Sequence, residues 1–272
     1  MNLKNFFDEH PKAALAFSRS AESAYLLYAA LKCGADIQPY FVNTQFHPRF
    51  EEENTRRLCA QMGVQLSTIQ LDILSVAQIT RNAADRCYYC KKAVFSAVRE
   101  QACKDGYDIV IDGTNALESV CGCPWTSVLH ELGILSPLQL CGITRKRVKE
   151  LSAEAGLITP MVSGHSCLAC RIPTGTFIRI NDLNSIEECE NILYRLGFTD
   201  FCVSVREGNA ILQFTPEQRL RAIKDKSLLH HLLGDKFGDI EIACIQEDAP
   251  KIHFPVLRPA DAQSSLQPVL FG

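Results

Sequence analysis

Short apolar runs alternate with helix-like runs through the first 112 residues, and this alternation constrains the fold more than any other feature of the sequence. The apolar runs have the length of buried strands and occupy residues 13–17, 37–42, 64–71 and 107–112. The runs between them have helical periodicity and occupy residues 23–33, 48–62, 72–82 and 91–104. Strands that alternate with helices at this spacing form parallel sheets. We therefore predict an α/β fold, with a parallel sheet and helices on both of its faces.

The pattern changes near residue 176, after a loop at 160–176 that is rich in Ser, Gly, Cys and Pro. The segments that follow are predicted as helices at 184–196 and 216–233 and strands at 201–206, 210–214 and 239–245. The first two of these strands flank Gly208, which predicts a hairpin. We therefore predict an α/β domain at 1–176, a small C-terminal α+β domain at 177–247 and a Pro-rich tail at 248–272.

The composition limits the classes of function. The chain has 272 residues, enough to bury a hydrophobic core, and a net charge of −3 without a long basic run. This charge argues against generic nucleic-acid binding. No apolar stretch reaches the roughly 18 residues of a membrane-spanning helix, and the charged N-terminus lacks the apolar core of a signal peptide. We expect a cytoplasmic protein that does not bind membranes.

The loop after the first predicted strand contains three serines. Ser18, Ser20 and Ser23 offer hydroxyl groups at the start of a helix, where exposed amides favour an anion. The first strand–loop–helix unit of an α/β sheet is the usual phosphate site. Neither GxxxxGK[ST] nor GxGxxG occurs there, which excludes two common nucleotide loops. The same serines also fit an ordinary helix cap centred on Ser20.

Two CxxC pairs stand out among the 13 cysteines. Cys87 and Cys90 precede the helix predicted at 91–104, whose N-terminal amides are expected to lower the thiol pKa values. Cys167 and Cys170 lie in the loop at 160–176. The two pairs are too far apart for a local zinc ribbon. They fit a structural zinc site, a thiolate or iron–sulfur site for sulfur transfer, or unrelated thiols.

The serine loop resembles the S-G-G-x-D-S motif of the ATP-pyrophosphatase (PP-loop) superfamily, whose members adenylate a substrate and release pyrophosphate. Ser18 and Ser23 stand at the two serine positions. Arg19 and Ser20 replace the two glycines, and their side chains crowd the approach of a pyrophosphate. Glu22 replaces the aspartate and keeps a negative charge for Mg²⁺. The resemblance implies an adenine nucleotide alpha hydrolase-like (PP-loop) fold that uses ATP and Mg²⁺.

Four further motifs make the resemblance more specific. RCYYCK, DGTN, GITRK and CLACRIPTG follow the serine loop in this order, at residues 86–91, 112–115, 142–146 and 167–175. This order resembles the LarE family of ATP-dependent sacrificial sulfur transferases over about residues 13–243. That family adenylates a carboxylate of a pyridinium mononucleotide and then transfers sulfur to it. Some members give up a cysteine's own sulfur, and others use a [4Fe-4S] cluster held by three cysteines.

The resemblance assigns roles to individual residues. Cys167 matches the sulfur donor, and Cys87, Cys90 and Cys167 are the implied catalytic and cluster-binding cysteines, with Cys170 as an alternate ligand. Arg171 and Arg206 are the implied substrate-binding residues. The implied nucleotide-binding residues are Ser18, Arg19, Ser20, Glu22, Ser23, Asn43, Asp112, Thr114 and Asn115. Asp112 and Asn115 also fit a plain turn and strand cap, His165 is a candidate base or a solvated loop residue, and Trp125 is a candidate stacking or packing residue.

The chain also departs from the family's pattern. Ser204 and Gln213 stand where the family has an arginine and a carboxylate, which predicts a different small-molecule or nucleotide-like substrate. The family's habit of assembling through its C-terminal domain implies a homo-oligomer. Three functions remain in competition: a sulfur-inserting enzyme, a non-catalytic nucleotide- or cluster-binding relative, and an ATP-pyrophosphatase of the NAD-synthetase type.

Overall fold

The larger part of the chain is built on a four-stranded parallel sheet. The computed structural model describes residues 1–18, 20–117, 126–157 and 167–245. The strands of the sheet are β1 (Lys12–Ala16), β2 (Asp36–Asn43), β3 (Ser67–Gln70) and β4 (Val110–Ile111). They pair in the order β3-β2-β1-β4, and every neighbouring pair is parallel. The predicted α/β fold of the PP-loop kind is thus confirmed.

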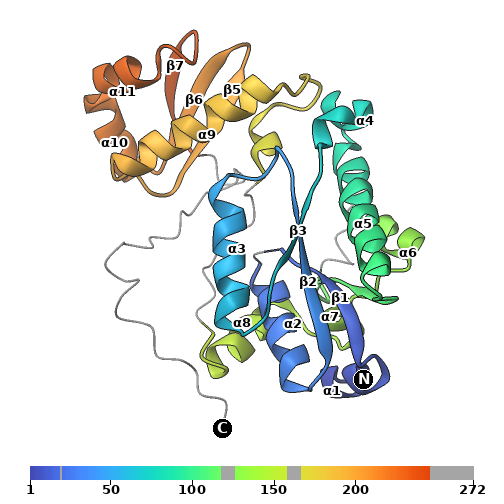
Figure 1. Cartoon of the computed structure of the whole chain (residues 1–272). Helices are drawn as coiled ribbons and strands as arrows, with labels where there is room; N and C mark the ends of the chain where they lie inside the picture. Colours follow the sequence, from blue (N-terminus) through green and yellow to red (C-terminus); the bar gives the residue numbers. More distant parts are fainter. Residues whose placement is uncertain (19, 118–125, 158–166, 246–272) are drawn as a thin grey trace.

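Helices cover both faces of this sheet (Figure 1). On one face lie α1 (Leu3–Glu9), α2 (Ala21–Lys32), α3 (Phe50–Gln61), α7 (Pro137–Leu140) and α8 (Arg145–Glu154). The other face is covered by α5 (Arg86–Lys104) and α6 (Thr126–Leu132), which bury Phe95, Val98 and Leu129 against β1, β2 and β4. Because apolar side chains emerge from both faces of the strands, each face forms its own core.

The strand order creates a switch point between β1 and β4. The chain leaves β1 and crosses to β2 on one side, while β4 pairs with β1 on the other side. In open α/β sheets, ligands bind beyond the carboxyl ends of the strands at such a point. The serine loop follows β1 and the DGTN segment follows β4, so both candidate motifs lie at this edge.

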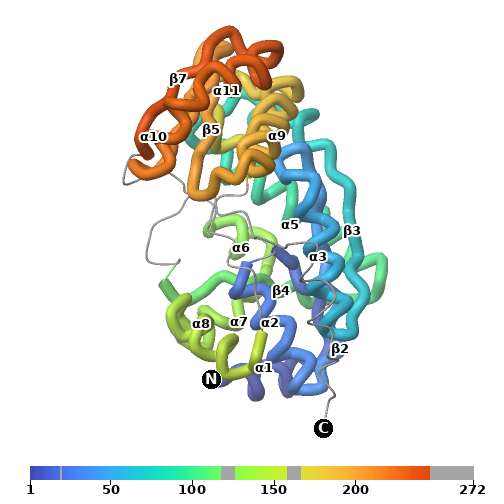
Figure 2. The backbone as a smooth tube through the Cα atoms, turned by 90° about the vertical axis from the view of Figure 1, so that its left-hand side faces the viewer, coloured from blue at the N-terminus to red at the C-terminus, as the bar shows by residue number. Residues whose placement is uncertain are grey.

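The C-terminal part forms a second, smaller sheet of β5 (Phe201–Arg206), β6 (Asn209–Phe214) and β7 (Ile240–Cys244). The predicted hairpin about Gly208 is formed by β5 and β6, which pair antiparallel. The last strand, β7, pairs with β6 in parallel. The helices α9 (Ile180–Arg195), α10 (Pro216–Lys224) and α11 (Lys226–Leu233) pack against it. This lobe lies beyond the carboxyl ends of the parallel strands (Figures 1 and 2).

Several elements differ from the sequence prediction. Helix α1 was not predicted, although Phe6 and Phe7 on one side of it are buried. Helix α5 begins at Arg86, so the first CxxC pair lies inside the helix and not before it. The helix predicted at 72–82 is a 3₁₀ turn, η1 (Ile73–Ser75), followed by the short α4 (Ala77–Thr80). The helix predicted at 216–233 is divided at Asp225 into α10 and α11.

Within the described residues, no helix combines the length and the apolar character needed to cross a bilayer. The predicted division at 176/177 stays a prediction, and the predicted tail at 248–272 lies outside the described residues.

Candidate functional site

The serine loop is a helix cap whose hydroxyl groups bond to one another. Ser20 is the N-cap of α2, and its hydroxyl accepts the amide of Ser23 at 3.2 Å. The hydroxyl of Ser18 lies 3.2 Å from that of Ser20 and 3.4 Å from that of Ser23, and the Ser23 hydroxyl donates to the Ser18 carbonyl. The three hydroxyl groups and the Ser23 amide therefore bond within the loop, and a phosphate that contacts them would have to replace these bonds. Arg19 lies outside the described residues.

Glu22 in the first turn of α2 pairs with a residue that the sequence prediction did not single out. Its carboxylate lies 3.4 Å from Nε of Arg145, the first residue of α8. Arg145 belongs to the GITRK motif, and Thr144 caps the same helix by accepting the amide of Arg147. The carboxylate of Glu22, which the resemblance assigns to Mg²⁺, thus lies beside the guanidinium of Arg145 from the GITRK motif.

The DGTN segment packs directly against the serine loop. A Cβ atom added to Gly113 would lie 2.9 Å from the backbone nitrogen of Ser23, so only glycine allows this approach. Asp112 beside it is buried and accepts the hydroxyl groups of Ser136, at 2.6 Å, and of Thr114. Burial raises the pKa of Asp112, and these two hydroxyl groups oppose the rise. This network joins the end of β4 to Ser136, the residue that precedes α7.

The remaining predicted nucleotide residues are bound within the protein. The amide of Asn43, at the end of β2, donates to Glu52 at 2.9 Å and to Gln70 at 3.2 Å. Asn115 is buried, and its side-chain oxygen accepts the amide of Leu117. Both residues lie at the carboxyl edge of the sheet, as expected. Their contact with a nucleotide stays a prediction.

The fold brings the two CxxC pairs together through Asn82 and Arg86. Asn82 is fully buried and has a positive φ of 54°. Its side-chain nitrogen donates to the carbonyls of Ile172 at 3.3 Å and Pro173 at 2.9 Å, and its oxygen accepts a bond from Arg86. Arg86 also donates to the Ala169 carbonyl at 3.0 Å. These bonds bridge segments about 90 residues apart, and they place the CLACRIPTG turn against the start of α5.

The Arg86 guanidinium lies among the thiols. Its Nη2 is 3.8 Å from the sulfur of Cys87 and 3.6 Å from that of Cys170. The Cys170 side chain hydrogen-bonds to the Cys167 thiol, and this bond, together with burial, raises the pKa of Cys167. Burial also raises the pKa of Cys90. The expected lowering of thiol pKa values by helix amides is therefore wrong for Cys90, because α5 begins four residues before it.

A [4Fe-4S] cluster does not fit this arrangement. Four thiols offer the right donor chemistry. However, the described residues include no group of three or more His, Cys, Asp or Glu side chains positioned to hold a metal ion. Two sulfurs accept bonds from a guanidinium, and the thiols of one pair bond to each other. The ligand set Cys87, Cys90 and Cys167, with Cys170 as alternate, stays a prediction that the structure does not support.

The turn that carries Cys167 is bound to the edge of the large sheet. The amide of Leu168, the first residue of η3 (Leu168–Arg171), donates to the carbonyl of Phe46 at 2.9 Å. Phe46 follows β2 by three residues, so this bond holds the Cys167 turn beside the carboxyl ends of the parallel strands. Cys167 itself is half-buried and Cys170 is exposed.

Arg171, predicted to bind substrate, takes part in a buried ion pair. Its Nε lies 3.0 Å from Glu190 on α9, with 0% and 3% of the two side chains exposed. Its Nη1 donates to the Cys167 carbonyl at 2.8 Å. Burial raises the pKa of Glu190, and Arg171 opposes this rise. In this structure Arg171 orients the Cys167 turn, and its contact with substrate stays a prediction.

The structure separates Arg206 from the cysteine pairs. Cys202 on β5 is buried and interacts electrostatically with Cys170 and Arg171. Arg206 lies four residues further along β5, about 13 Å away at the rise of a strand, and is exposed beside the hairpin turn. Its role toward a substrate also stays a prediction. Trp125 and His165 lie outside the described residues.

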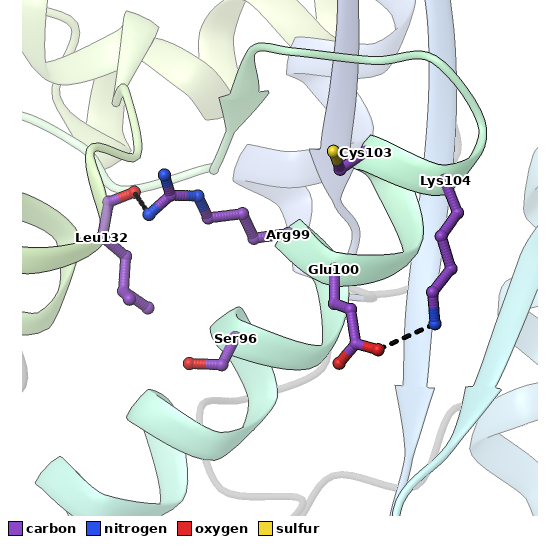
Figure 3. A pocket seen from close by; sticks show the side chains of 6 residues that line it. All are labelled: Ser96, Arg99, Glu100, Cys103, Lys104 and Leu132. Carbon is purple, nitrogen blue, oxygen red and sulfur yellow. Dashed lines mark hydrogen bonds and ion pairs between the residues drawn. The ribbon is translucent and has the colours of Figure 1, made fainter.

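An open hollow on the surface lies apart from these motifs (Figure 3). It is lined by Ser96, Arg99, Glu100, Cys103, Lys104 and Leu132, at the C-terminal end of α5. Arg99 donates to the Leu132 carbonyl, and Lys104 pairs with Glu100. None of the predicted site residues lines this hollow. The candidate site therefore consists of the carboxyl edge of the large sheet and the cysteine pairs beside it.

Three residues of the site were not identified from the sequence: Arg86, Asn82 and Arg145. Arg86 is the first residue of RCYYCK and Arg145 lies in GITRK. Both motifs were recognised in the sequence, but neither arginine was given a role. For Asn82 the sequence offered no signal, because its importance comes from a backbone conformation that favours Gly, Asn and Asp.

The fold and the site together define an α/β protein of the PP-loop type with a thiol site at the carboxyl edge of its sheet. No family model matches the chain. It is similar to two uncharacterised proteins: one from Synechocystis, 28% identical over 84% of this chain and 85% of that protein, and one from Methanocaldococcus jannaschii, 29% identical over 71% and 73%.

The chain is also similar to a pyridinium-3,5-bisthiocarboxylic acid mononucleotide synthase from Lactiplantibacillus plantarum. The two are 27% identical over 212 residues, which is 77% of this chain and 76% of that protein. The resemblance to the LarE-type sulfur transferases that the motifs predict is confirmed by this similarity.

Proposed function

We propose that this chain is an ATP-dependent sulfur transferase that adenylates a carboxylate on a small, nucleotide-like substrate and passes sulfur to it from Cys167. One observation carries the proposal: the Cys167 turn is hydrogen-bonded to the segment after β2, at the sheet edge where the serine loop and the DGTN segment meet. A thiol and an anion-binding helix start therefore share one edge. The similarity to a synthase of a thiocarboxylic acid supports this chemistry.

The roles of this chain's residues follow from their positions. The amides at the start of α2 favour the phosphates of ATP, and Glu22 supplies negative charge for their Mg²⁺. Because Gly113 has no Cβ atom, the DGTN segment can lie directly against the backbone of Ser23. Arg171 holds the backbone carbonyl of Cys167, and the role of the Cys167 thiol is to attack the acyl adenylate. Attack by the Cys167 sulfur on the acyl carbon expels AMP and forms a thioester. Loss of the Cys167 α proton and cleavage of its Cβ–Sγ bond then release the thiocarboxylate and leave dehydroalanine at position 167.

The experiment separates adenylation from sulfur transfer. The full chain is incubated with Mg²⁺, ATP and a pyridinium carboxylate mononucleotide, and pyrophosphate and thiocarboxylate are both measured. Cys167→Ala should still release pyrophosphate but form no thiocarboxylate. Cys103→Ala, which removes an exposed thiol at the far end of α5, should match the wild type.

A second comparison tests the altered loop. The triple variant Arg19→Gly/Ser20→Gly/Glu22→Asp restores the PP-loop pattern. If the wild type and this variant both fail to bind ATP, the proposal is wrong. If only the variant releases pyrophosphate, the chain is a relative of the sulfur transferases that has lost adenylation.

A further inference from the structure

The two thiols of the second CxxC pair lie side by side in one tight turn. Cys167 is the N-cap residue of the 3₁₀ helix η3, and the amide of Cys170 donates to the Cys167 carbonyl at 3.0 Å. In 3₁₀ geometry the side chains at i and i+3 eclipse one another. The two side chains accordingly form a direct hydrogen bond. Two thiols at this spacing are in position to form a disulfide with little movement of the backbone.

The two thiols differ in environment, and the difference indicates which one attacks. Cys167 is half-buried in the turn, and its backbone carbonyl accepts bonds from Cys170 and Arg171. Cys170 is exposed, and Nη2 of Arg86 donates to its sulfur at 3.6 Å. A guanidinium at a sulfur stabilises negative charge there. The Arg86 guanidinium also donates hydrogen bonds to the Asn82 side chain and to the Ala169 carbonyl. These bonds hold it beside Cys170.

We propose that Cys170 is a resolving thiol: it attacks the Cys167 sulfur after sulfur transfer, releases the product and leaves a Cys167–Cys170 disulfide. This inference rests on the function proposed above and deepens it. It replaces the sacrifice of the Cys167 sulfur by a cycle in which Cys167 carries a renewable sulfur atom as a persulfide. The sulfur donor is a persulfide or polysulfide, and the reductant that restores both thiols is a dithiol.

Each step balances. The donor transfers one sulfane sulfur to the Cys167 thiol and is left as a thiol, or as a polysulfide shorter by one sulfur. The terminal persulfide sulfur then attacks the acyl carbon of the adenylate, the C–O bond to phosphate breaks, and AMP leaves with the electron pair. Cys170 as a thiolate attacks the sulfur of Cys167, and the acyl thiolate leaves with the electrons of the broken S–S bond. The dithiol reduces the resulting disulfide by two electrons and becomes a disulfide itself.

The core of this chemistry can be tested without ATP or an acceptor. The full-length reduced chain is loaded with inorganic polysulfide, the excess is removed, and intact mass and sulfide release are followed with time. In the wild type, Cys170 should displace sulfide from the Cys167 persulfide and form a disulfide that peptide mapping assigns to Cys167 and Cys170. In Cys170→Ser, the extra sulfur atom should stay on Cys167. Cys103→Ser controls for the loss of an exposed thiol and should behave as the wild type.

Arg86 provides a second arm of the test. Arg86→Gln should slow disulfide formation by about tenfold or more, because a charged hydrogen bond to the attacking sulfur is lost. Arg81→Gln, an exposed arginine just before Asn82, should leave the rate unchanged. A disulfide that maps to Cys87 or Cys90, or a Cys170→Ser chain that releases sulfide as fast as the wild type, overturns the assignment of Cys170.

Turnover with ATP and the acceptor distinguishes this inference from the proposed function. If the wild type forms thiocarboxylate while Cys167 loses its own sulfur and becomes dehydroalanine, the proposed function stands and the resolving role is wrong. If the disulfide forms as described but no pyrophosphate is released, the dithiol chemistry stands and the proposed function fails. Thiocarboxylate formed over many cycles by the wild type with a dithiol, and only once per chain by Cys170→Ser, supports both.

Discussion

Arg145 Nε lies 3.4 Å from Glu22 Oε1, which joins the start of α8 to the first turn of α2. The Glu22 side chain is 9% exposed and that of Arg145 is 55% exposed, so this is a partly screened ion pair. Such a pair contributes at most about 1 kcal/mol to stability. It nevertheless competes with any cation that Glu22 is to bind, because the guanidinium occupies one side of the carboxylate.

Arg145→Gln should therefore make Glu22 more available to Mg²⁺. We expect the Mg²⁺ concentration for half-maximal ATP binding to fall by about fivefold, the equivalent of about 1 kcal/mol. Titration calorimetry at several Mg²⁺ concentrations measures this. Arg147→Gln on the same helix is the control, since Arg147 pairs with Glu150 and Glu154. A rise in the Mg²⁺ requirement would mean that Arg145 helps to bind the nucleotide.

Asp112 predicts a pH dependence of stability. Its pKa is raised from 3.8 in the folded protein, chiefly by burial, so the folded state holds its proton at pH values where the unfolded state has lost it. Stability must then fall as pH rises from 3.8 to the native pKa. We expect the free energy of unfolding of the wild type, minus that of Asp112→Asn, to decrease over this window and level off above it.

Urea denaturation across this pH range measures the difference for Asp112→Asn. The exposed Asp108→Asn, four residues earlier in the chain, should show no such trend. A difference that grows with pH would show that the bonds from Ser136 and Thr114 stabilise the charged carboxylate by more than burial disfavours it.

Gly113 predicts a steric effect on the nucleotide loop. Gly113→Ala would place a methyl group 2.9 Å from the Ser23 nitrogen and 3.1 Å from its Cα atom. Backbone atoms at the start of α2 would have to move, so we expect weaker ATP binding and a loss of about 1–3 kcal/mol in stability. Gly34→Ala is the matched control, because its φ of 75° strains an alanine but nothing lies within 4 Å of the added carbon. Equal effects of the two substitutions on ATP binding would contradict a role for this close approach in the nucleotide loop.

The buried pair of Arg171 and Glu190 predicts a large loss of stability when one charge is removed. Glu190→Gln leaves the guanidinium charge in the core without its counterion, which typically costs about 3–5 kcal/mol. The double variant Arg171→Met/Glu190→Leu should cost less than the single one, since neither charge of the pair remains. A single-variant loss below about 1 kcal/mol, near the value of a surface pair, would contradict the burial of this pair.

Much of the fold followed from the sequence because its signals are local. The buried strand at 12–16 and the hairpin about Gly208 depend on apolar runs and turn residues that neighbours in the chain specify. Asp225 shows the limit of this approach. The periodicity of 216–233 is continuous, but the helix ends at Asp225 and a new one begins because both must pack against the small sheet.

The site was less predictable because its contacts join distant segments. Cys87 and Cys170 were both expected at a shared site, but nothing in their spacing indicates that Arg86 lies between their sulfurs. Arg171 lies in the CLACRIPTG motif and was predicted to bind substrate. Its ion pair with Glu190 depends on the position of α9, which the sequence does not give. Side-chain partners across the fold are decided by tertiary packing, which residue spacing does not encode.

The cluster of buried residues around the small sheet has a mechanical consequence for the whole molecule. Phe46, Ile73 and Ile79, all from the first half of the chain, lie in the same apolar cluster as Leu183 and Phe201 from the second half. Separating the halves would expose apolar surface on both, so the two sheets should melt together in a single calorimetric transition. Any opening of the chain that admits a substrate must therefore occur in the loops at the sheet edge, because a hinge between the lobes would break a shared core.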